Sequence, residues 1–540
     1  MPQPIPIRGL SEKGIVKDAA PYDLEPNAWS SGSNVRFTRR KARRSPIYRR
    51  VATAIPSPQW VAGYRPSTGF DQVLVCQDDG SLALVVNGTP TDVTPTARTT
   101  ASATTPWTTC LLGDVLYANR PSHVPAGFVP AATEFDVLPD WPSDYRCAAL
   151  RSFKDVLVAL DITKGSTRHP SMVKWSDVTL TGQMPASWDP TDLATLSNEV
   201  EVAQLDSAWI DACTQGDRLT LYSQTQVWSM DYTGDTSDAG QNLFILRQLP
   251  VNGGVISQNC VVDVDGVHYV FGTTDIYRHD GTQAASISDG AVREWVYRSL
   301  DNRLTERFFA AHLPKYTEIV FGFVSRDADA YFTSPTRCNR AAVFNYSTGT
   351  WSLLDLPNVC GVALANVDPT LVWTDAAASW ATLGGSWKDL RDGYEDHVVF
   401  GASSLTGGVS DHMLLGYDPM DQGSLNFPLE TTAVAPALLE RTGIDLDEVG
   451  APLRGWKNIS SIIPQIWVAR NLPVQIRVGS SQTPSGPVTW DPAMSFNPRT
   501  GYKVDTRTGG RYLALRVRVP QIVDFEVTGF DVEVLGGGDR

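Results

Sequence analysis

The sequence predicts an all-β chain, with a β-propeller of about six blades and a C-terminal β-sandwich-like domain joined by the N-terminal strand segment. Helix-like periodicity is scarce along the 540 residues, whereas short apolar alternations recur between turns. The 43 Gly and 36 Pro are spread along the chain, as many short strands joined by turns require. The 16 Trp, 17 Tyr and 18 Phe favour strands, because flat rings pack well on pleated sheets.

One pattern recurs six times between about residues 57 and 367: a turn, a short apolar strand, a second turn and a second strand with an aromatic residue. The centres are separated by 42, 41, 62, 50 and 51 residues and lie at Leu74, Leu116, Leu157, Leu219, Tyr269 and Val320. Propeller repeats run about 40–50 residues per four-stranded blade. The spacing predicts a propeller over 56–367, with a long polar loop near 163–191 in the widest gap. Hairpins in two stacked sandwiches are the alternative.

Three further segments flank this region. Residues 1–55 form an N-terminal arm and strand that carry a basic run. Residues 368–425 contain two predicted strands, HVVFG and HMLLGYD, which either complete the last blade or bridge to the next domain. Residues 426–540 are predicted to be a second β-domain. Its clearest strand, RYLALRVRVP, alternates apolar residues with arginines, as a half-buried strand does.

Charge is distributed unevenly. The net charge is −14, but the 15 residues from Arg36 to Arg50 hold eight cations and no anion, which leaves 37 basic against 59 acidic residues elsewhere. A body with a net charge of −22 argues against gripping nucleic acid through phosphate neutralisation, although it would let DNA pass without sticking.

The basic run has three possible roles: contact with DNA, pairing with an acidic surface of a neighbouring subunit, or a solvated arm. We favour the second, because opposite charge across an interface attracts at long range and orients the partners. The candidate interface residues are Arg36, Arg39, Arg40, Lys41, Arg43 and Arg44.

Motifs for catalysis and metal binding are missing from the sequence. There is no G-x-S-x-G elbow, phosphate-binding loop, dinucleotide fingerprint or H-E-x-x-H motif, so we expect neither an enzyme nor a cofactor. The seven Cys are at least 22 residues apart, which predicts reduced thiols rather than a zinc site or a disulfide framework. No run of 18 apolar residues occurs and the start lacks a secretory pattern, so we expect synthesis in the cytoplasm and no membrane span.

Three local patterns have both a functional and a structural interpretation. His268 alternates with apolar neighbours and is predicted to be a strand residue rather than a ligand. The segment Val262–Gly266 has two carboxylates before a Gly but lacks the other ligands of a calcium loop, so a tight turn is predicted. The segment Phe344–Trp351 is similar to the Asp-box of sialidases, but a Ser replaces the Asp and the spacing is one residue short, which favours a turn with Trp351 packed inward.

Two segments carry a family resemblance. The stretch 22–46, YDLEPNAWSSGSNVRFTRRKARRSP, resembles the N-terminal signature of tail nozzle (tail tubular) and packaged-DNA-stabilisation proteins of short-tailed bacteriophages. The matching positions are Pro26, Asn27, Ala28, Trp29, Asn34, Val35, Arg36, Phe37, Ala42 and Arg43. A second segment near the C-terminus resembles the last domain of the same family. It matches at Trp490, Phe496, Val504, Asp505, Arg507, Gly510, Arg511, Tyr512 and Leu515.

The resemblance implies a structural virion protein of a phage tail. Such a protein forms a ring, commonly a hexamer, below the head-to-tail adaptor (connector) protein and bears tail fibre or spike proteins. Viral double-stranded DNA would pass through its lumen without tight binding, along a tube lined by the C-terminal domain. We place a gate in the acidic region 428–460, with Asp445, Asp447 and Glu448 as candidates. The alternatives are a glycan-binding or receptor-binding propeller of the tail, and a cellular scaffold propeller that binds peptides.

Overall fold

The structure is a computed structural model. It describes residues 4–53, 55, 57–67, 71–86, 88–96, 98–99, 102–235, 243–327, 331–332, 336–365, 398–402, 412–418, 435–446, 455–484 and 486–536. These residues are almost entirely strands and turns, which confirms the all-β prediction. Their helical elements are α1 (Arg293–Ser299), η1 (Thr305–Arg307) and η2 (Pro314–Tyr316). None of these is long and apolar enough to cross a membrane.

Five four-stranded antiparallel sheets follow one another along the chain, each built from four consecutive strands. The first two contain β6 (Pro58–Tyr64), β7 (Gln72–Gln77), β8 (Leu82–Val86) and β9 (Thr89–Asp92), then β10 (Thr108–Leu112), β11 (Val115–Asn119), β12 (Ala126–Phe128) and β13 (Asp136–Val137). The third contains β14 (Tyr145–Phe153), β15 (Val156–Lys164), β16 (Thr167–Trp175) and β17 (Asn198–Glu201). The fourth and fifth contain β18 (Trp209–Gln215), β19 (Arg218–Ser223), β20 (Val227–Tyr232) and β21 (Phe244–Gln248), then β22 (Val261–Val264), β23 (Val267–Phe271), β24 (Ile276–His279) and β25 (Ala284–Ser286).

A sixth sheet is larger and recruits strands from distant parts of the sequence. Its order is β26 (Phe309–Leu313), β27 (Glu318–Phe323), β28 (Cys338–Asn345), β29 (Thr350–Leu364), β30 (Val398–Ala402), β31 (Met413–Asp418) and β5 (Ile47–Thr53). The two strands predicted in 368–425 therefore extend this sheet, and the end of the N-terminal segment forms its edge. We call these six sheets the upper body.

The predicted repeat centres all fall at equivalent places. Leu74, Leu116, Leu157, Leu219, Tyr269 and Val320 each lie on the second strand of one of the six sheets. The long loop predicted near 163–191 is present but begins later, because β16 occupies 167–175 and the stretch without strands runs over 176–197. Strands β14, β15 and β16 are nine residues each, so longer strands fill part of the wide gap.

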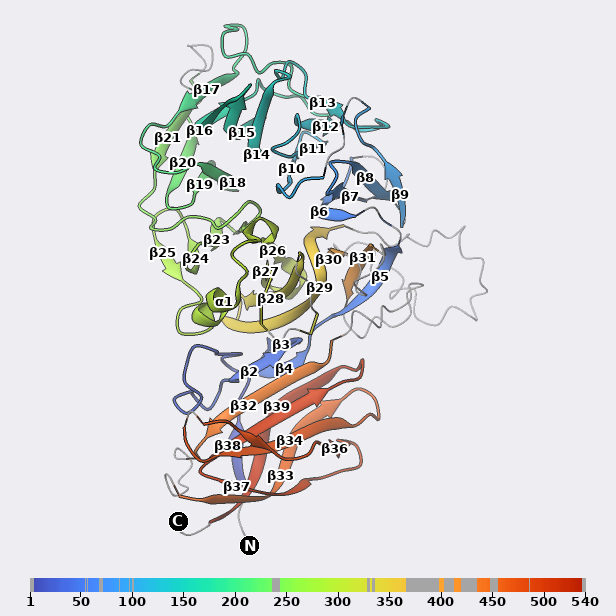
Figure 1. The fold of residues 1–540 in the computed structure, drawn as a ribbon, viewed down its shortest axis with the longest axis vertical. Helices are drawn as coiled ribbons and strands as arrows, with labels where there is room; N and C mark the ends of the chain where they lie inside the picture. Colours follow the sequence, from blue (N-terminus) through green and yellow to red (C-terminus); the bar gives the residue numbers. More distant parts are fainter. Residues whose placement is uncertain are drawn as a thin grey trace, which may run out of the picture.

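Each sheet of the upper body packs against the next through its first strand, and Figure 1 shows the sheets placed around a common centre. Strand β10 contacts β14, β14 contacts β18, β18 contacts β22, and β22 contacts β26. The first sheet meets the second through a hydrogen bond from Trp60 Nε1 to Thr109 Oγ1 (3.1 Å). It also meets the sixth sheet, where β6 packs on β29 and β30.

The lower body consists of two six-stranded sheets. One has the order β3 (Val35–Thr38), β4 (Lys41–Arg44), β39 (Phe525–Gly536), β33 (Lys457–Val468) and β37 (Val504–Gly510), and β1 (Pro4–Arg8) also pairs with β39. The other has the order β2 (Ser31–Ser33), β32 (Ala437–Ile444), β38 (Tyr512–Val519), β34 (Val474–Ser481) and β35 (Thr489–Trp490), and β36 (Met494–Phe496) also pairs with β34. As predicted, the apolar residues of β38 are buried, and its arginines lie on the other face.

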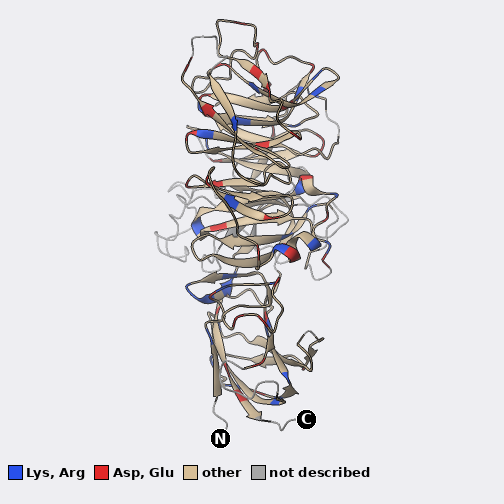
Figure 2. Cartoon of the chain, turned by 90° about the vertical axis from the view of Figure 1, so that its left-hand side faces the viewer, with Lys and Arg blue, Asp and Glu red and all other residues tan. Residues whose placement is uncertain are grey.

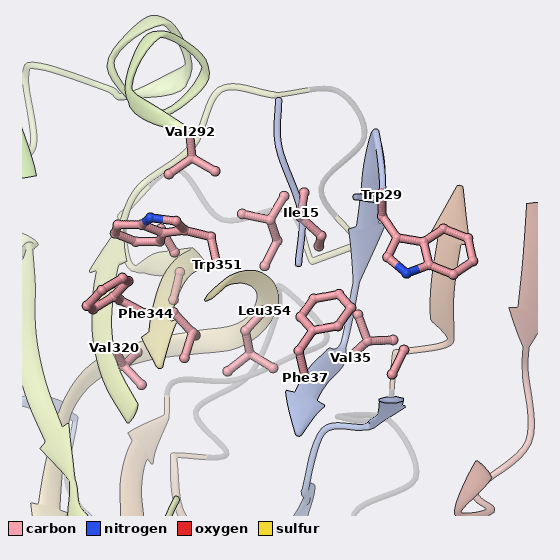
Figure 3. Packing of buried hydrophobic residues seen from close by; sticks show 14 of the residues in the cluster. Ile15, Trp29, Val35, Phe37, Val292, Val320, Phe344, Trp351 and Leu354 are labelled. Atoms are coloured by element: carbon pink, nitrogen blue, oxygen red, sulfur yellow. The ribbon is translucent and has the colours of Figure 1, made fainter. Parts of the chain in front are cut away.

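The N-terminal segment belongs to both bodies, as the blue strands of Figure 1 show. Strands β1 to β4 pair within the lower body, whereas β5 pairs within the upper body. The largest apolar core also spans both bodies, and Figure 3 shows Ile15, Val35 and Phe37 between Trp351 on one side and Trp29 on the other. Side chains of residues 10–48 therefore form the packed connection between the two bodies, which we call the junction.

Candidate functional site at the junction of the two β bodies

Asn34 is the best-connected polar residue of the junction. It has a left-handed backbone (φ 58°) and is 6% exposed. Its amide Nδ2 donates to Asp355 Oδ2 (2.8 Å) and to the Pro436 carbonyl (3.0 Å), and its Oδ1 accepts from Asp355 N–H (3.0 Å). Asp355 lies in the upper body and Pro436 immediately precedes the lower-body strand β32. One amide thus bonds to both bodies at once, and burial raises the pKa of Asp355.

Two cations of the basic run are engaged within the chain: Arg36 is partly buried and Arg44 is buried. Arg36 pairs with Glu318 (3.2 Å) and lies 4.1 Å from the centre of the Tyr316 ring, so it fastens β3 to the upper body. Arg44 donates to three backbone carbonyls, those of Ala435, Val519 and Gln521. Burial lowers the pKa of Arg44 to about 10, but the group still carries its charge at neutral pH.

Arg36 and Arg44, two of the six candidate interface residues, thus have their partners within the chain. Alternate residues of a strand face opposite sides, so the sequence predicts that Arg36 lies on the face away from Val35 and Phe37. The sequence does not predict which segment covers that second face. The register places Val35 and Phe37 in the core, and Arg36 reaches the upper body from the other face.

The four other candidate interface residues lie at or near the tip of the β3–β4 hairpin: Arg39, Arg40, Lys41 and Arg43. Lys41 and Arg43 both contact Glu526 of β39, at 2.6 and 2.9 Å. Arg40 reaches Glu12 at 2.9 Å but stays 73% exposed, and Arg39 is exposed and makes no ion pair within the described parts of the chain. Figure 2 shows basic residues gathered at this level, between the two bodies.

The aromatic residues of the N-terminal resemblance are core residues of the junction. Trp29 is fully buried, packs edge-on against Phe530 of β39 at 6.3 Å, and donates from Nε1 to Ser11 Oγ. Phe37 is 2% exposed. Gly14 has φ 73°, and a Cβ there would lie 2.6 Å from the Trp351 carbonyl, so the chain needs a glycine at this crossing.

The residues of the C-terminal resemblance mark a crossover between the two lower sheets. Gly510 ends β37 in one sheet and Tyr512 begins β38 in the other, so Arg511 is the connecting residue. A Cβ on Gly510 would lie 2.5 Å from Ser480 Cβ, and buried Lys457 donates to the Arg511 carbonyl (3.1 Å). The N-terminal segment therefore lies in the core of the junction, and the C-terminal segment lies at the crossover between the two lower sheets. The structure does not bring the two segments together as one surface site.

The gate candidates are only partly described. Asp445 lies half-buried just after β32, whereas Asp447 and Glu448 fall outside the described residues.

A cavity of about 690 Å³ lies where the first strands of the six upper sheets converge. Its lining includes Trp60 of β6, Cys110 of β10, Arg151 of β14, Asp211 of β18 and Asp263 of β22. Arg151 is fully engaged: it donates to both Asp211 carboxylate oxygens (2.7 and 2.8 Å), to Asn259 Oδ1 (2.8 Å) and to the Thr109 carbonyl (2.9 Å). No motif in the sequence indicated this network.

The same network crosses the centre of the upper body. Asn259 lies just before β22 and donates from Nδ2 to the carbonyl of Trp107, which lies just before β10 (2.8 Å). These residues belong to the fifth and second sheets, so a hydrogen-bonded bridge spans the cavity region. The Arg151 guanidinium and the Asp211 carboxylate are satisfied by each other and by neighbouring groups of the chain. A structural role is therefore favoured for this ion pair.

A second buried polar chain joins the fourth and fifth sheets. Gly281 N–H donates to His279 Nδ1 (3.1 Å), which leaves His279 Nε2–H to donate to Tyr222 Oη (2.6 Å). The Tyr222 hydroxyl then donates to His268 Nδ1 (2.6 Å), and His268 Nε2–H donates to the Thr214 carbonyl (3.0 Å). Burial lowers the pKa of His268 to about 4 and that of His279 to about 3, so both are neutral at pH 7.

The other local predictions have structural outcomes. His268 lies in strand β23, as predicted, and Asp265–Gly266 form the tight turn between β22 and β23. Trp351 is buried against Phe344 at 5.0 Å, as the turn interpretation requires. All seven Cys are free thiols, and no cluster of three metal-ligating side chains occurs in the portion of the chain described above.

Comparison with protein-family models and with curated proteins gives no match. Among solved structures, the chain is similar to the computationally designed Ika8 protein. The likeness covers 75% of this chain and all of that one, at 9% identity and a TM-score of 0.35. A likeness at that level carries no argument about fold or function.

Proposed function

We propose that this chain is a structural virion protein, the tail nozzle of a short-tailed phage, whose copies form the tube that conducts the genome. The observation that carries the proposal is the position of the resembling residues. Trp29, Asn34 and Phe37 fasten the upper body to the lower body, and Gly510 makes the lower body's sheet crossover. These residues hold parts of the fold together and have no catalytic role in this proposal. Firm connections of this kind suit a protein that bears mechanical load.

The six upper sheets are proposed to be the blades of a closed β-propeller. Support comes from the contacts between successive first strands and from the packing of β6 on β29. In this arrangement each blade covers a face of the next, and no sheet is left with a bare apolar surface.

The genome would not travel through a single chain. A duplex, whose major groove alone is about 12 Å wide, does not fit a cavity of about 690 Å³ that a hydrogen-bonded bridge crosses. A DNA conduit must therefore lie between copies, which is why the proposal requires a ring, taken to be a hexamer. The ring would attach below the adaptor protein and carry fibres or spikes.

The mechanism is electrostatic and mechanical. A lumen lined by acidic surfaces would repel phosphates, so DNA would slide instead of adsorbing, and the net charge of −14 favours such a lining. We keep the gate hypothesis for region 428–460, where Asp445 is the candidate that the structure describes.

The test of this function is the mass of the assembled protein. We expect native mass spectrometry to find a ring of about six 58.9 kDa chains, either alone or on a connector ring, and negative-stain images to show a central bore. A chain that remains monomeric at about 100 µM, and that does not bind the connector ring, would contradict the proposal.

A glycan-binding or receptor-binding propeller is the second candidate. The cavity favours it to a degree, because Trp60 and Asp263 line the same space and sugars stack on such rings beside carboxylates. Asp211, however, is already occupied by Arg151. A glycan-array signal from the monomer that Trp60→Ala abolishes would favour this candidate over the nozzle.

A further inference from the structure

We infer that the tip of the β3–β4 hairpin, Arg39–Arg40, is a preformed cationic contact for an acidic surface on a second copy of this chain. The inference rests on the proposed ring and identifies the residues that would orient neighbouring copies.

The tip adopts a backbone that arginine does not favour. Strands β3 and β4 pair Thr38 with Lys41, so the loop has two residues, and both have positive φ, 48° for Arg39 and 65° for Arg40. This is a type I′ turn, for which Asn-Gly, Asp-Gly and Gly-Gly are preferred. A left-handed backbone is disfavoured for a residue with a Cβ, because the Cβ then lies close to the following carbonyl oxygen.

Other turns of the same kind in this chain use the favoured residues. Asp265–Gly266 connects β22 to β23 with φ 52° and 80°, and Gly113–Asp114 connects β10 to β11 with φ 58° and 70°. The Arg39–Arg40 turn therefore differs from these two turns, because it has no Gly, Asn or Asp at its left-handed positions. Stability of the hairpin does not explain it, so we look to what the two side chains contact.

The base of the hairpin holds the tip rigidly. Phe37 and Ala42 are buried, Arg36 is fixed by Glu318 and Tyr316, and Arg44 is fixed by carbonyls of the lower body. Beyond this clamp, Arg39 and Arg40 are exposed at the level of the junction (Figure 2). A cationic pair whose backbone is already ordered loses little entropy when it binds.

The small number of exposed cations at the tip favours a protein carboxylate over a DNA duplex as the partner. Two exposed cations, of which Arg40 already contacts Glu12, release too few counterions for tight DNA binding. A second copy supplies the complementary surface, since each chain has 59 acidic against 45 basic residues.

The decisive variant is Arg39→Asn/Arg40→Gly, which removes both charges and installs the residues that the turn prefers. We expect Tm not to fall, while the concentration needed for ring assembly rises by about tenfold at low salt. Wild-type assembly should weaken as salt is raised towards 0.5 M, and assembly of the variant should depend less on salt. The matched control is Arg278→Gln/Arg298→Gln, which removes two exposed cations elsewhere and should assemble like wild type.

The outcomes separate this inference from the proposed function. If the Asn-Gly variant assembles as well as wild type, the inference is wrong and the ring stands. If wild type never forms a ring, the proposed function fails and the inference fails with it. If a 20-bp duplex binds wild type but not the Asn-Gly variant in fluorescence anisotropy, the partner is nucleic acid and the inference is overturned.

Discussion

Single residues of the N-terminal segment decide whether the two bodies are joined. Asn34 satisfies groups on both sides with one amide, and a buried group that loses its partner is costly because water cannot replace it. Arg36 acts similarly through Glu318, whose pKa is raised by burial, an effect that the arginine opposes. The sequence marks these residues as polar and near apolar neighbours, but it does not name their partners.

Replacing Asn34 tests this directly. Asn34→Ala removes two donated bonds and one accepted bond and leaves Asp355 under-satisfied, so we expect a loss of about 3 kcal/mol of unfolding free energy. Urea denaturation measures it. The exposed Asn302→Ala is the control and should change stability by less than about 0.5 kcal/mol. Equal effects from the two substitutions would show that the Asn34 bonds contribute little.

Neighbouring sheets of the upper body are joined by apolar packing and by a few buried polar chains. The Tyr222 hydroxyl links β19 to β23 and β24, because it accepts from His279 Nε2–H and donates to His268 Nδ1. His268 Nδ1 accepts from Tyr222, and His279 Nδ1 accepts from Gly281 N–H, only while these nitrogens are unprotonated. Protonation of either nitrogen would break the hydrogen bond that it accepts. This pair of sheets is therefore expected to be sensitive to acid.

The sign of the pH effect follows from the lowered pKa values. An unfolded histidine titrates near 6.5, whereas His268 and His279 titrate near 4 and 3 in the folded chain. The unfolded state binds more protons below pH 6.5, so stability is complete above that pH and falls as pH drops towards 4. Thermal melts at pH 7, 5.5 and 4.5 measure this fall. His268→Gln/His279→Gln should be less stable at pH 7 but lose less on acidification, and parallel curves would refute this account.

At the scale of the whole molecule, the lower body is assembled from both ends of the chain. Strands β1 to β4 come from residues 4–44 and complete two sheets whose other strands come from residues 437–536. The two bodies also share one apolar core through the junction. Folding of the lower body therefore requires strands that lie almost a full chain length apart to pair with each other. Such long-range contacts predict a slow folding rate.

This dependence can be tested with fragments. Residues 435–540 alone lack four strands and the rings of Trp29 and Phe37, so we expect no cooperative thermal transition by circular dichroism. Co-expression with residues 1–53 should restore a cooperative transition and co-purification. A cooperative melt of the isolated fragment would mean that the N-terminal strands are dispensable for the lower body.

Local sequence patterns were enough to predict the β character of this chain and the places of its repeating sheets. Alternation and turn residues are local signals, and the six centres from Leu74 to Val320 were found at the second strand of each sheet. Local patterns do not show that Asn34 meets Asp355, 321 residues away, or that Arg36 and Arg44 find partners within the chain while Arg39 and Arg40 remain exposed. A local pattern fixes which face of a strand is apolar, but the partner across that face is chosen by packing between segments far apart in sequence.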